Sequence, residues 1–97
     1  MKIHSSPGQE VKIELKENPS TGYRWNLTNL PVSVELLGDA FVLSSQRPGA
    51  AGIRIFRLVP TTTGTFLFEL ELRREWETEA LERSVIELTV ECNPLPP

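Results

Sequence analysis

The sequence predicts an all-β sandwich of about seven to eight strands. Three observations support this prediction. Short segments alternate apolar and polar residues, turn-forming residues separate these segments, and no segment carries a long helical period of apolar residues. The clearest alternation is Phe66–Leu72, whose apolar residues Phe66, Phe68, Leu70 and Leu72 share one face.

The first half of the chain is expected to contribute four or five strands. Trp25, on the third strand, is expected to be the large central core residue, and Tyr23 is expected to pack on the sandwich. Leu30-Pro31 breaks the chain after this strand. The expected strands are a short one around Ile3, then Val11–Leu15, Tyr23–Leu27, and Val34–Leu37 with Phe41–Leu43, the last two separated by Gly38-Asp39.

Ile53–Val59 is a strong strand with an ambiguous face. Ile53 and Ile55 favour one phase, whereas Phe56 and Leu58 favour the other. We expect Phe56 and Leu58 to point inward. The isoleucines are then explained either by a bulge near Ile55 or by an edge position that tolerates exposed apolar side chains.

The last strand is predicted over Val85–Cys92. Cys92 continues its apolar phase, so a small buried hydrophobe is the expected role. The proline-rich residues 93–97 cannot continue a ladder and should fray.

A helix-forming composition sets apart the segment Glu75–Arg83. Its length favours a long hairpin loop, with room for one turn of helix, before the final strand. Trp76 then either folds back onto the sandwich or is offered to a partner. Trp and Arg are the residues that most often anchor interfaces, and Arg74 lies two positions before Trp76.

Length and composition limit the function classes. The 97 residues, 39% hydrophobic and 24% charged, predict one globular domain over 1–97. The net charge is −3, and Lys and Arg are scattered among Glu, which argues against nucleic acid as a partner. No run of residues is long enough to span a membrane. We expect a monomer.

Enzymatic and metal chemistry are poorly supported. One cysteine allows no intrachain disulfide, and the lone His4 argues against a zinc site or a Cys–His relay. The many glutamates between Glu69 and Glu82 indicate a solvated face and loop rather than a catalytic pair. We therefore expect no enzyme activity, no metal and no cofactor.

The compartment depends on where the natural chain begins. Strand-like sequence follows Met1 directly, without a secretory leader. A complete chain would be cytoplasmic, and a chain from which a leader was removed would be periplasmic or secreted.

The most informative segment is the loop Asn18-Pro19-Ser20-Thr21-Gly22, between two alternating strands. Pro19 fixes its own φ and favours an extended Asn18, and Gly22 allows a positive φ. Ser20 and Thr21 carry hydroxyls that bond to nearby backbone or to a partner. A stiff polar loop suits binding, because little order is lost on contact. Taken alone, the same pattern also fits a tight connection without a partner, in which Asn18 shapes its own loop.

Three loops together resemble those of the chagasin-type (I42 family) inhibitors of papain-like cysteine proteases. The family carries Asn-Pro-Thr-Thr-Gly followed by an aromatic residue and a Trp, then Gly-x-Gly-Gly, then Arg-Pro-Trp. This chain has Asn18-Pro19-Ser20-Thr21-Gly22 followed by Tyr23 and Trp25, then Gly49-Ala50-Ala51-Gly52, then Arg74-Glu75-Trp76. The similarity extends from Val11 to Glu91. Ala51 replaces a family glycine, and Glu75 replaces the proline and adds a negative charge.

The resemblance implies an immunoglobulin-like β-sandwich with the three loops at one end. It also implies that the first loop enters the protease cleft while the other two grip its sides. Thr21 would offer its hydroxyl and backbone to the thiolate–imidazolium pair. Trp76 would pack on an aromatic wall of the enzyme, and Arg74 would hydrogen-bond at the rim.

The alternative is a structural or protein-binding sandwich module without protease inhibition. It predicts that Trp76 packs onto its own sandwich and that Gly49–Gly52 is only a turn. The inhibitor hypothesis predicts all three loops at the same end of the sandwich.

Overall fold

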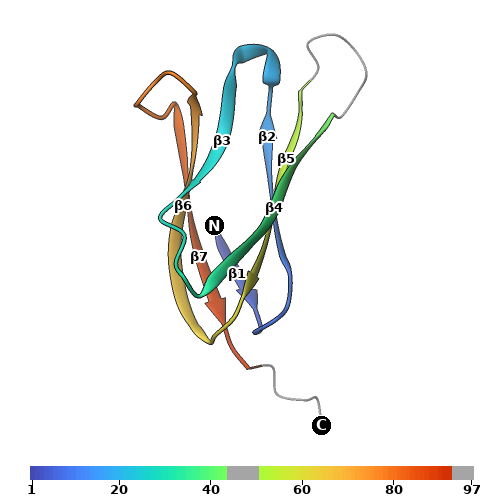
Figure 1. Ribbon diagram of the computed structural model, residues 1–97, viewed down its shortest axis with the longest axis vertical. Coiled ribbons are helices and arrows are strands. Elements are labelled where there is room, and N and C mark those ends of the chain that lie inside the picture. The colour runs from blue at the N-terminus through green and yellow to red at the C-terminus, as the bar shows by residue number, and fades with distance from the viewer. Residues whose placement is uncertain (44–50, 93–97) are drawn as a thin grey trace.

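Two β-sheets form the molecule (Figure 1). The structure, a computed structural model, describes residues 1–43 and 51–92. The elements in this part of the chain are β1 (Lys2–Ser5), β2 (Val11–Glu17), the 3₁₀ helix η1 (Pro19–Thr21), β3 (Tyr23–Thr28), β4 (Val34–Leu43), β5 (Gly52–Pro60), β6 (Gly64–Arg74) and β7 (Glu82–Val90). The prediction of an all-β sandwich is confirmed.

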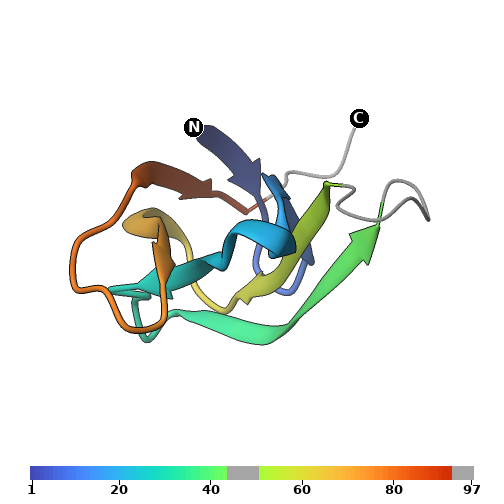
Figure 2. The same ribbon diagram turned by 90° about the horizontal axis from the view of Figure 1, so that it is seen from above.

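β2 and β3 follow each other in the sequence but lie at the edges of different sheets. One sheet has the order β1-β7-β6-β3, and the other has the order β2-β5-β4. All pairs are antiparallel except β1 with β7, which is parallel. The connection from β2 to β3, residues 18–22, therefore crosses from one sheet to the other at one end (Figure 2). The described ranges contain no helix long and apolar enough to cross a membrane.

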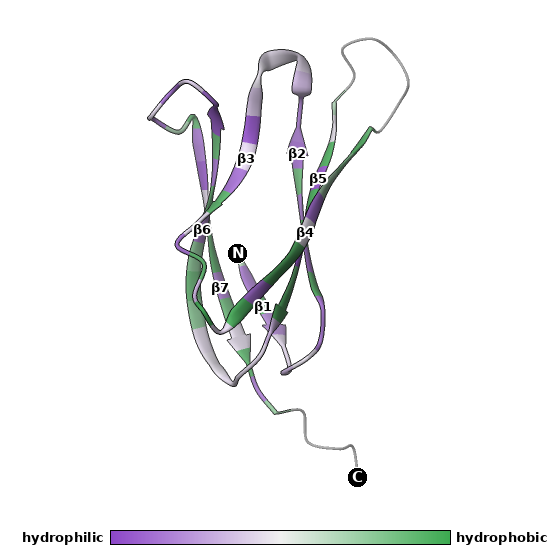
Figure 3. Cartoon of the chain, in the orientation of Figure 1, coloured by the Kyte–Doolittle hydropathy of each residue, from purple (hydrophilic) through white to green (hydrophobic). Residues whose placement is uncertain are grey.

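The core lies between the sheets and follows the period-two alternation of the strands. Trp25 is only 5% exposed, which confirms its predicted central place. Hydrophobic positions recur along the strands, whereas the 18–22 loop is hydrophilic to neutral (Figure 3). Burying each such side chain contributes about 1.5–3 kcal/mol. The core residues are Val11, Ile13, Trp25, Val34, Phe56, Leu58, Phe68, Leu70, Ile86, Leu88 and Val90.

β5 is the central strand of its sheet, which settles the ambiguity of its faces. Phe56 and Leu58 point inward, as predicted. Ile55 continues both ladders, opposite Glu14 on one side and Ala40 on the other, so neither the bulge at Ile55 nor the edge position is found. The outward isoleucines are half-buried because cross-strand neighbours flank them on both sides.

β4 is one strand, not two segments separated at Gly38-Asp39. The register shifts between Leu36, opposite Leu58, and Gly38, opposite Arg57. Leu37 is therefore the additional residue of a bulge. The sequence left one or two strands open here, and the structure has one, because a bulge absorbs the irregularity at Gly38-Asp39 without ending the ladder.

The last hairpin differs from the prediction where β7 ends, and its loop agrees with the prediction except for the turn of helix. β7 ends at Val90, opposite the first residue of β6, so Cys92 has no partner strand and is exposed rather than buried. Residues 93–97 lie outside the described part. Glu75–Leu81 is a loop, as predicted, but without a turn of helix. Instead, Glu77 N donates to Arg74 O at 3.1 Å, and Leu81 N donates to Leu72 O at 2.7 Å.

A matched pair of leucines on β6 tests this core. Leu70 is fully buried, whereas Leu67 is 61% exposed on the outer face. We expect Leu70→Ala to lower the free energy of unfolding by about 2–5 kcal/mol, because a cavity adds to the lost burial. Leu67→Ala should change it by no more than about 0.5 kcal/mol. Urea unfolding measures both, and equal losses would contradict the inward assignment.

Candidate functional site

The predicted site residues that the structure describes gather at one end of the sandwich, here called the loop end. Tyr23 pairs with Arg74, so the 75–81 hairpin lies level with the 18–22 loop. Glu17 pairs with Gly52, which pairs with Leu43, so both described ends of the β4–β5 connection lie there too. From above, η1 lies between this hairpin and the ends of β4 and β5 (Figure 2). Gly49 and Ala50 lie outside the described residues.

The 18–22 loop is held by its own hydrogen bonds. Asn18 Oδ1 accepts from Ser20 N at 3.1 Å and from Ser20 Oγ at 2.7 Å. Gly22 adopts the left-handed conformation, φ 80°, which closes the turn through its N–H to Pro19 O at 3.2 Å. Asn18 therefore shapes its own loop, as expected.

Thr21 stands at the end of η1 with its hydroxyl already engaged. Oγ1 donates to Asn18 O at 2.7 Å and accepts from Tyr23 N at 3.4 Å. A hydroxyl has one hydrogen and two lone pairs. In this conformation, the hydroxyl of Thr21 is therefore not a free O–H donor.

Arg74 joins the 18–22 loop to the hairpin. Its Nε donates to Thr21 O at 3.1 Å, and its guanidinium lies 4.4 Å from the centre of the Tyr23 ring. Nη1 pairs with Glu77 at 3.2 Å. Cation–π contact and a charge-assisted hydrogen bond both favour this position. In this structure Arg74 is thus held within the molecule, at the junction of two loops.

Trp76 is exposed beside that junction rather than buried in the sandwich. It is 75% exposed, and the Arg74 guanidinium lies 5.9 Å from the centre of its ring. A Cβ added at Gly22 would lie 3.6 Å from Trp76 Cη2, so the ring tip extends over the loop. Trp76 therefore does not fold back into the core, and its apolar face is open to a partner.

Packing accounts for Gly52 in the described part of the second loop. A Cβ there would collide with Val42 O and with the Phe41 ring. Gly52 begins β5 and pairs with Glu17, whereas Ala51 precedes the strand and is exposed. Ala51 and Gly52 thus lie close to the 18–22 loop, and a larger residue is excluded at Gly52.

A buried charge beneath the 18–22 loop was not singled out from the sequence. Glu17 is 3% exposed, and its carboxylate accepts from Trp25 N at 2.8 Å and from Arg54 Nη2 at 2.7 Å. Val11, Ile13 and Leu15 occupy alternate, inward-facing positions of β2, and Glu17 is the next position of this series. That alternation was the signal in the sequence that could have identified Glu17 as buried.

Arg54 extends this network across the sandwich. Its Nη1 bonds to Asp39 at 3.1 Å, and Asp39 also accepts from Arg24 at 2.9 Å. Hydrogen bonding to Glu17 raises the pKa of Arg54, so the cation stays charged. Together with Trp25 Nε1, which donates to Lys16 O at 2.9 Å, these bonds fix both ends of the 18–22 loop.

Comparison with known proteins identifies the family. The model of the chagasin family of peptidase inhibitors, I42, matches residues 5–90. The chain belongs to the chagasin family. Amoebiasin-2 of Entamoeba histolytica is 35% identical over 77% of this chain, and the chain spans 63% of the length of Amoebiasin-2.

Solved structures agree with this assignment. The crystal structure of the cysteine protease inhibitor EhICP2 of Entamoeba histolytica matches with a TM-score of 0.78 at 30% identity, over 93% of this chain and 86% of that chain. The solution structure of Amebosin has a TM-score of 0.76 at 24% identity, over 93% of this chain and 88% of that chain, which shows a shared fold. The resemblance seen in the three loops is thereby confirmed.

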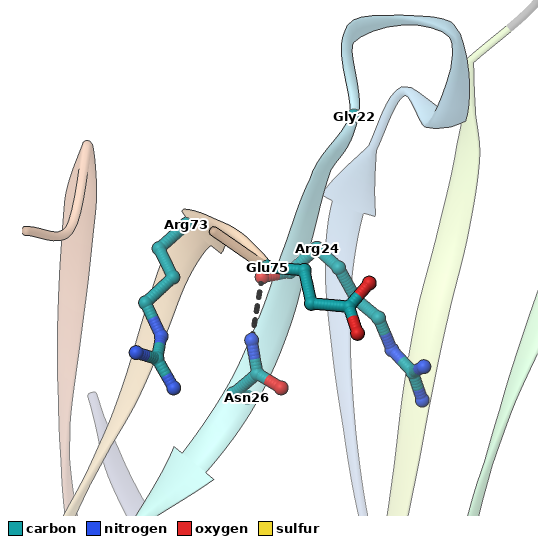
Figure 4. A pocket seen from close by; sticks show the side chains of 5 residues that line it. All are labelled: Gly22, Arg24, Asn26, Arg73 and Glu75. Atoms are coloured by element: carbon teal, nitrogen blue, oxygen red, sulfur yellow. Dashed lines mark hydrogen bonds between the residues drawn. The ribbon is translucent and has the colours of Figure 1, made fainter. Parts of the chain in front are cut away.

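The chagasin-family chain also has a groove beside the 18–22 loop, on the outer face of the four-stranded sheet. Its volume is about 330 Å³. Its lining comes from β3, β6 and both neighbouring loops (Figure 4). We call it the Arg73 groove, and it is lined by Gly22, Arg24, Asn26, Arg73 and Glu75.

The Glu17 carboxylate should dominate the stability of the loop end. Glu17→Gln leaves Arg54 with Asp39 as its only carboxylate among the described residues. We expect a loss of about 3 kcal/mol in the free energy of unfolding, because one partner of a buried pair is removed. Glu14→Gln, an exposed change on the same strand, should stay within about 0.5 kcal/mol. Indistinguishable urea midpoints for the two variants would refute this role of Glu17.

Arg74 should control the order of the 18–22 loop. Arg74→Gln removes the Nε bond to Thr21 O and the stacking on Tyr23. We expect lower heteronuclear NOE values and faster amide exchange for Thr21 and Gly22, since local order depends on these contacts. The control is Arg83→Gln, an exposed cation paired with Glu71. Unchanged loop dynamics in Arg74→Gln would contradict the role of a link between the loops.

Proposed function

We propose that this chain is a reversible, tight-binding inhibitor of papain-like cysteine proteases of the papain or cathepsin L type. The 18–22 loop enters the active-site cleft. Arg74–Trp76 and residues 49–52 flank the cleft on its two sides. Membership of the chagasin family supports this proposal, as does the structural similarity to EhICP2, which is a cysteine protease inhibitor.

The observation that carries the proposal is the preorganised 18–22 loop, which lies between the 75–81 hairpin and the described ends of β4 and β5. Its turn is closed by Asn18, Gly22 and Arg74 before any partner binds. Little conformational entropy is then lost on binding, so more of the contact energy remains as affinity. A contact of about 1,600 Å² is sufficient for a stable complex of this kind.

The same geometry explains how the loop would resist cleavage. Asn18 O accepts from Thr21 N, Pro19 O accepts from Gly22 N, and Thr21 O accepts from Arg74 Nε. The first two carbonyls accept the internal hydrogen bonds of the 3₁₀ turn, and the third accepts from the Arg74 side chain. Attack by a thiolate requires a carbonyl carbon held in line with the sulfur. At these three positions the loop would fill the cleft without presenting such a carbonyl.

Trp76 would supply the main apolar contact outside the cleft. Its ring is exposed and its back is supported by Gly22 and Arg74, so it meets a partner with little loss of side-chain freedom. Arg74 then acts as a positioning residue for both loops. We propose that one monomer of this chain binds one protease molecule.

The decisive experiment is a titration of the purified chain against active-site-calibrated papain and a cathepsin L-type enzyme. We expect loss of activity in proportion to added chain, up to one equivalent, with recovery on dilution. Full activity of both enzymes at high micromolar concentrations of the chain would overturn the proposal. Sedimentation of the free chain and of the mixture tests the monomer and the one-to-one complex.

The contribution of Trp76 can be measured in the same assay. We expect Trp76→Ala to raise the inhibition constant about 30-fold or more, since truncating an aromatic anchor costs about 2 kcal/mol. Val32→Ala is the control, because Val32 is fully exposed at the opposite end, where Ser33 O accepts from Thr61 N. An inhibition constant unchanged by Trp76→Ala would remove the hairpin from the contact.

A further inference from the structure

Arg73 differs from the other described arginines in having no carboxylate partner. A carboxylate oxygen lies within 3.5 Å of each of the others. Those paired arginines are Arg24, Arg54, Arg57, Arg74 and Arg83. Since Arg is always charged, Arg73 is a cation without a counter-charge among the described residues.

The guanidinium of Arg73 is also partly desolvated. Its Nε is buried and has no hydrogen-bond partner among the described residues. Its Nη1 donates to Glu77 O at 3.5 Å, which is a long hydrogen bond. A buried donor without a partner is unfavourable until a ligand satisfies it. This arrangement is therefore suited to an incoming acceptor.

The acidic side chain inside the Arg73 groove does not fill this role. Figure 4 shows the Glu75 carboxylate and the Arg73 guanidinium on opposite sides of Asn26, and no ion pair joins them. Arg24 points out of the groove towards its partner Asp39. Asn26 Nδ2 donates one hydrogen bond, to Arg24 O at 3.0 Å, and an amide nitrogen has a second N–H.

The Arg73 groove is continuous with the loops of the proposed contact surface. Gly22 belongs to the 18–22 loop, and Glu75 lies between Arg74 and Trp76. A protease that accepts the 18–22 loop in its cleft therefore places its surface residues at the mouth of this groove. The groove volume, about 330 Å³, admits a carboxylate side chain with water.

We propose that the Arg73 groove is a subsite for an Asp or Glu side chain of the target protease, held by Arg73 with Asn26. This inference rests on the proposed inhibitory function and adds the chemistry of the partner's surface. Arg binds a carboxylate through parallel N–H···O bonds, which demand a defined position. The groove thus makes the chain select proteases that carry a carboxylate beside the cleft.

The test compares inhibition constants of the full chain and of Arg73→Gln, at low and high salt, against a protease that the unchanged chain inhibits. We expect Arg73→Gln to weaken inhibition about tenfold or more at low salt, with a smaller effect at high salt. Arg73→Lys should recover only part of the loss, because an ammonium lacks the paired donors. Arg83→Gln, a cation on the same outer face paired with Glu71, should stay within about twofold.

Two further measurements separate recognition from a structural role. Arg73→Gln should melt at the same temperature as the unchanged chain or higher, because it removes a cation without a counter-charge. On the protease, changing each acidic residue of the cleft rim to its amide should reveal one that weakens inhibition by the unchanged chain. That change should have no further effect on Arg73→Gln, as in a double-mutant cycle.

The possible outcomes distinguish a failure of the proposed inhibitory function from a failure of the proposed subsite. If the unchanged chain inhibits no papain-like protease, the proposed function fails. If it inhibits and Arg73→Gln inhibits equally well, or if no rim carboxylate couples to Arg73, the subsite is refuted. Stabilisation of the unchanged chain by inorganic phosphate but not of Arg73→Gln, without such coupling, would assign the groove to a free anion and overturn the protein carboxylate.

Discussion

The contact on which the loop end depends is the buried pair of Glu17 and Arg54. Glu17 stands where β2 leaves its sheet and accepts from the backbone N–H of Trp25 on the opposite sheet. β3 is an edge strand, so this N–H would otherwise lack a ladder partner. One carboxylate thereby satisfies an edge donor, neutralises Arg54 and joins the two sheets beneath the 18–22 loop. Glu17 is buried and Arg54 mostly so, but each is paired and hydrogen-bonded, which is the condition for tolerating these charges.

Next to the Glu17–Arg54 pair, the 18–22 loop and the 75–81 hairpin are held together as one structural unit, although they are far apart in the sequence. Antiparallel pairing places Arg74 opposite Tyr23. From there, the guanidinium can reach the Thr21 carbonyl, the Tyr23 ring and Glu77 at the same time. A proline between Arg74 and Trp76, as in the family pattern, would stiffen the hairpin through its backbone. In this chain Glu75 occupies that position, and the described contacts of Arg74 with Glu77 and the 18–22 loop supply order through side chains instead. These links hold the 18–22 loop and the hairpin in one arrangement, which is the preorganisation that the proposed inhibition requires.

The charges around the loop end are arranged unevenly. Glu75, Glu77, Glu79 and Glu82 follow the hairpin, whereas Arg73 faces the groove on the outer sheet without a counter-charge among the described residues. A protease that binds this end as proposed would therefore carry an apolar surface for Trp76 and a carboxylate at the groove. Shape alone would admit many clefts, but an unpaired cation and a set of carboxylates discriminate between surfaces.

The sequence by itself determined the sandwich, most of its strands and the family. Alternation fixes which face of a strand is buried, and the Asn18–Gly22 turn residues encode their own conformation through local hydrogen bonds. It did not determine that β5 is central, that β4 passes Gly38 by a bulge, or that Cys92 lies beyond the ladder, because those facts depend on which strands become neighbours. The roles of Glu17, Arg73 and Arg74 were also decided only in three dimensions. Whether a charged side chain is paired, desolvated or stacked depends on contacts across the sheets and loops, and no local pattern specifies these contacts.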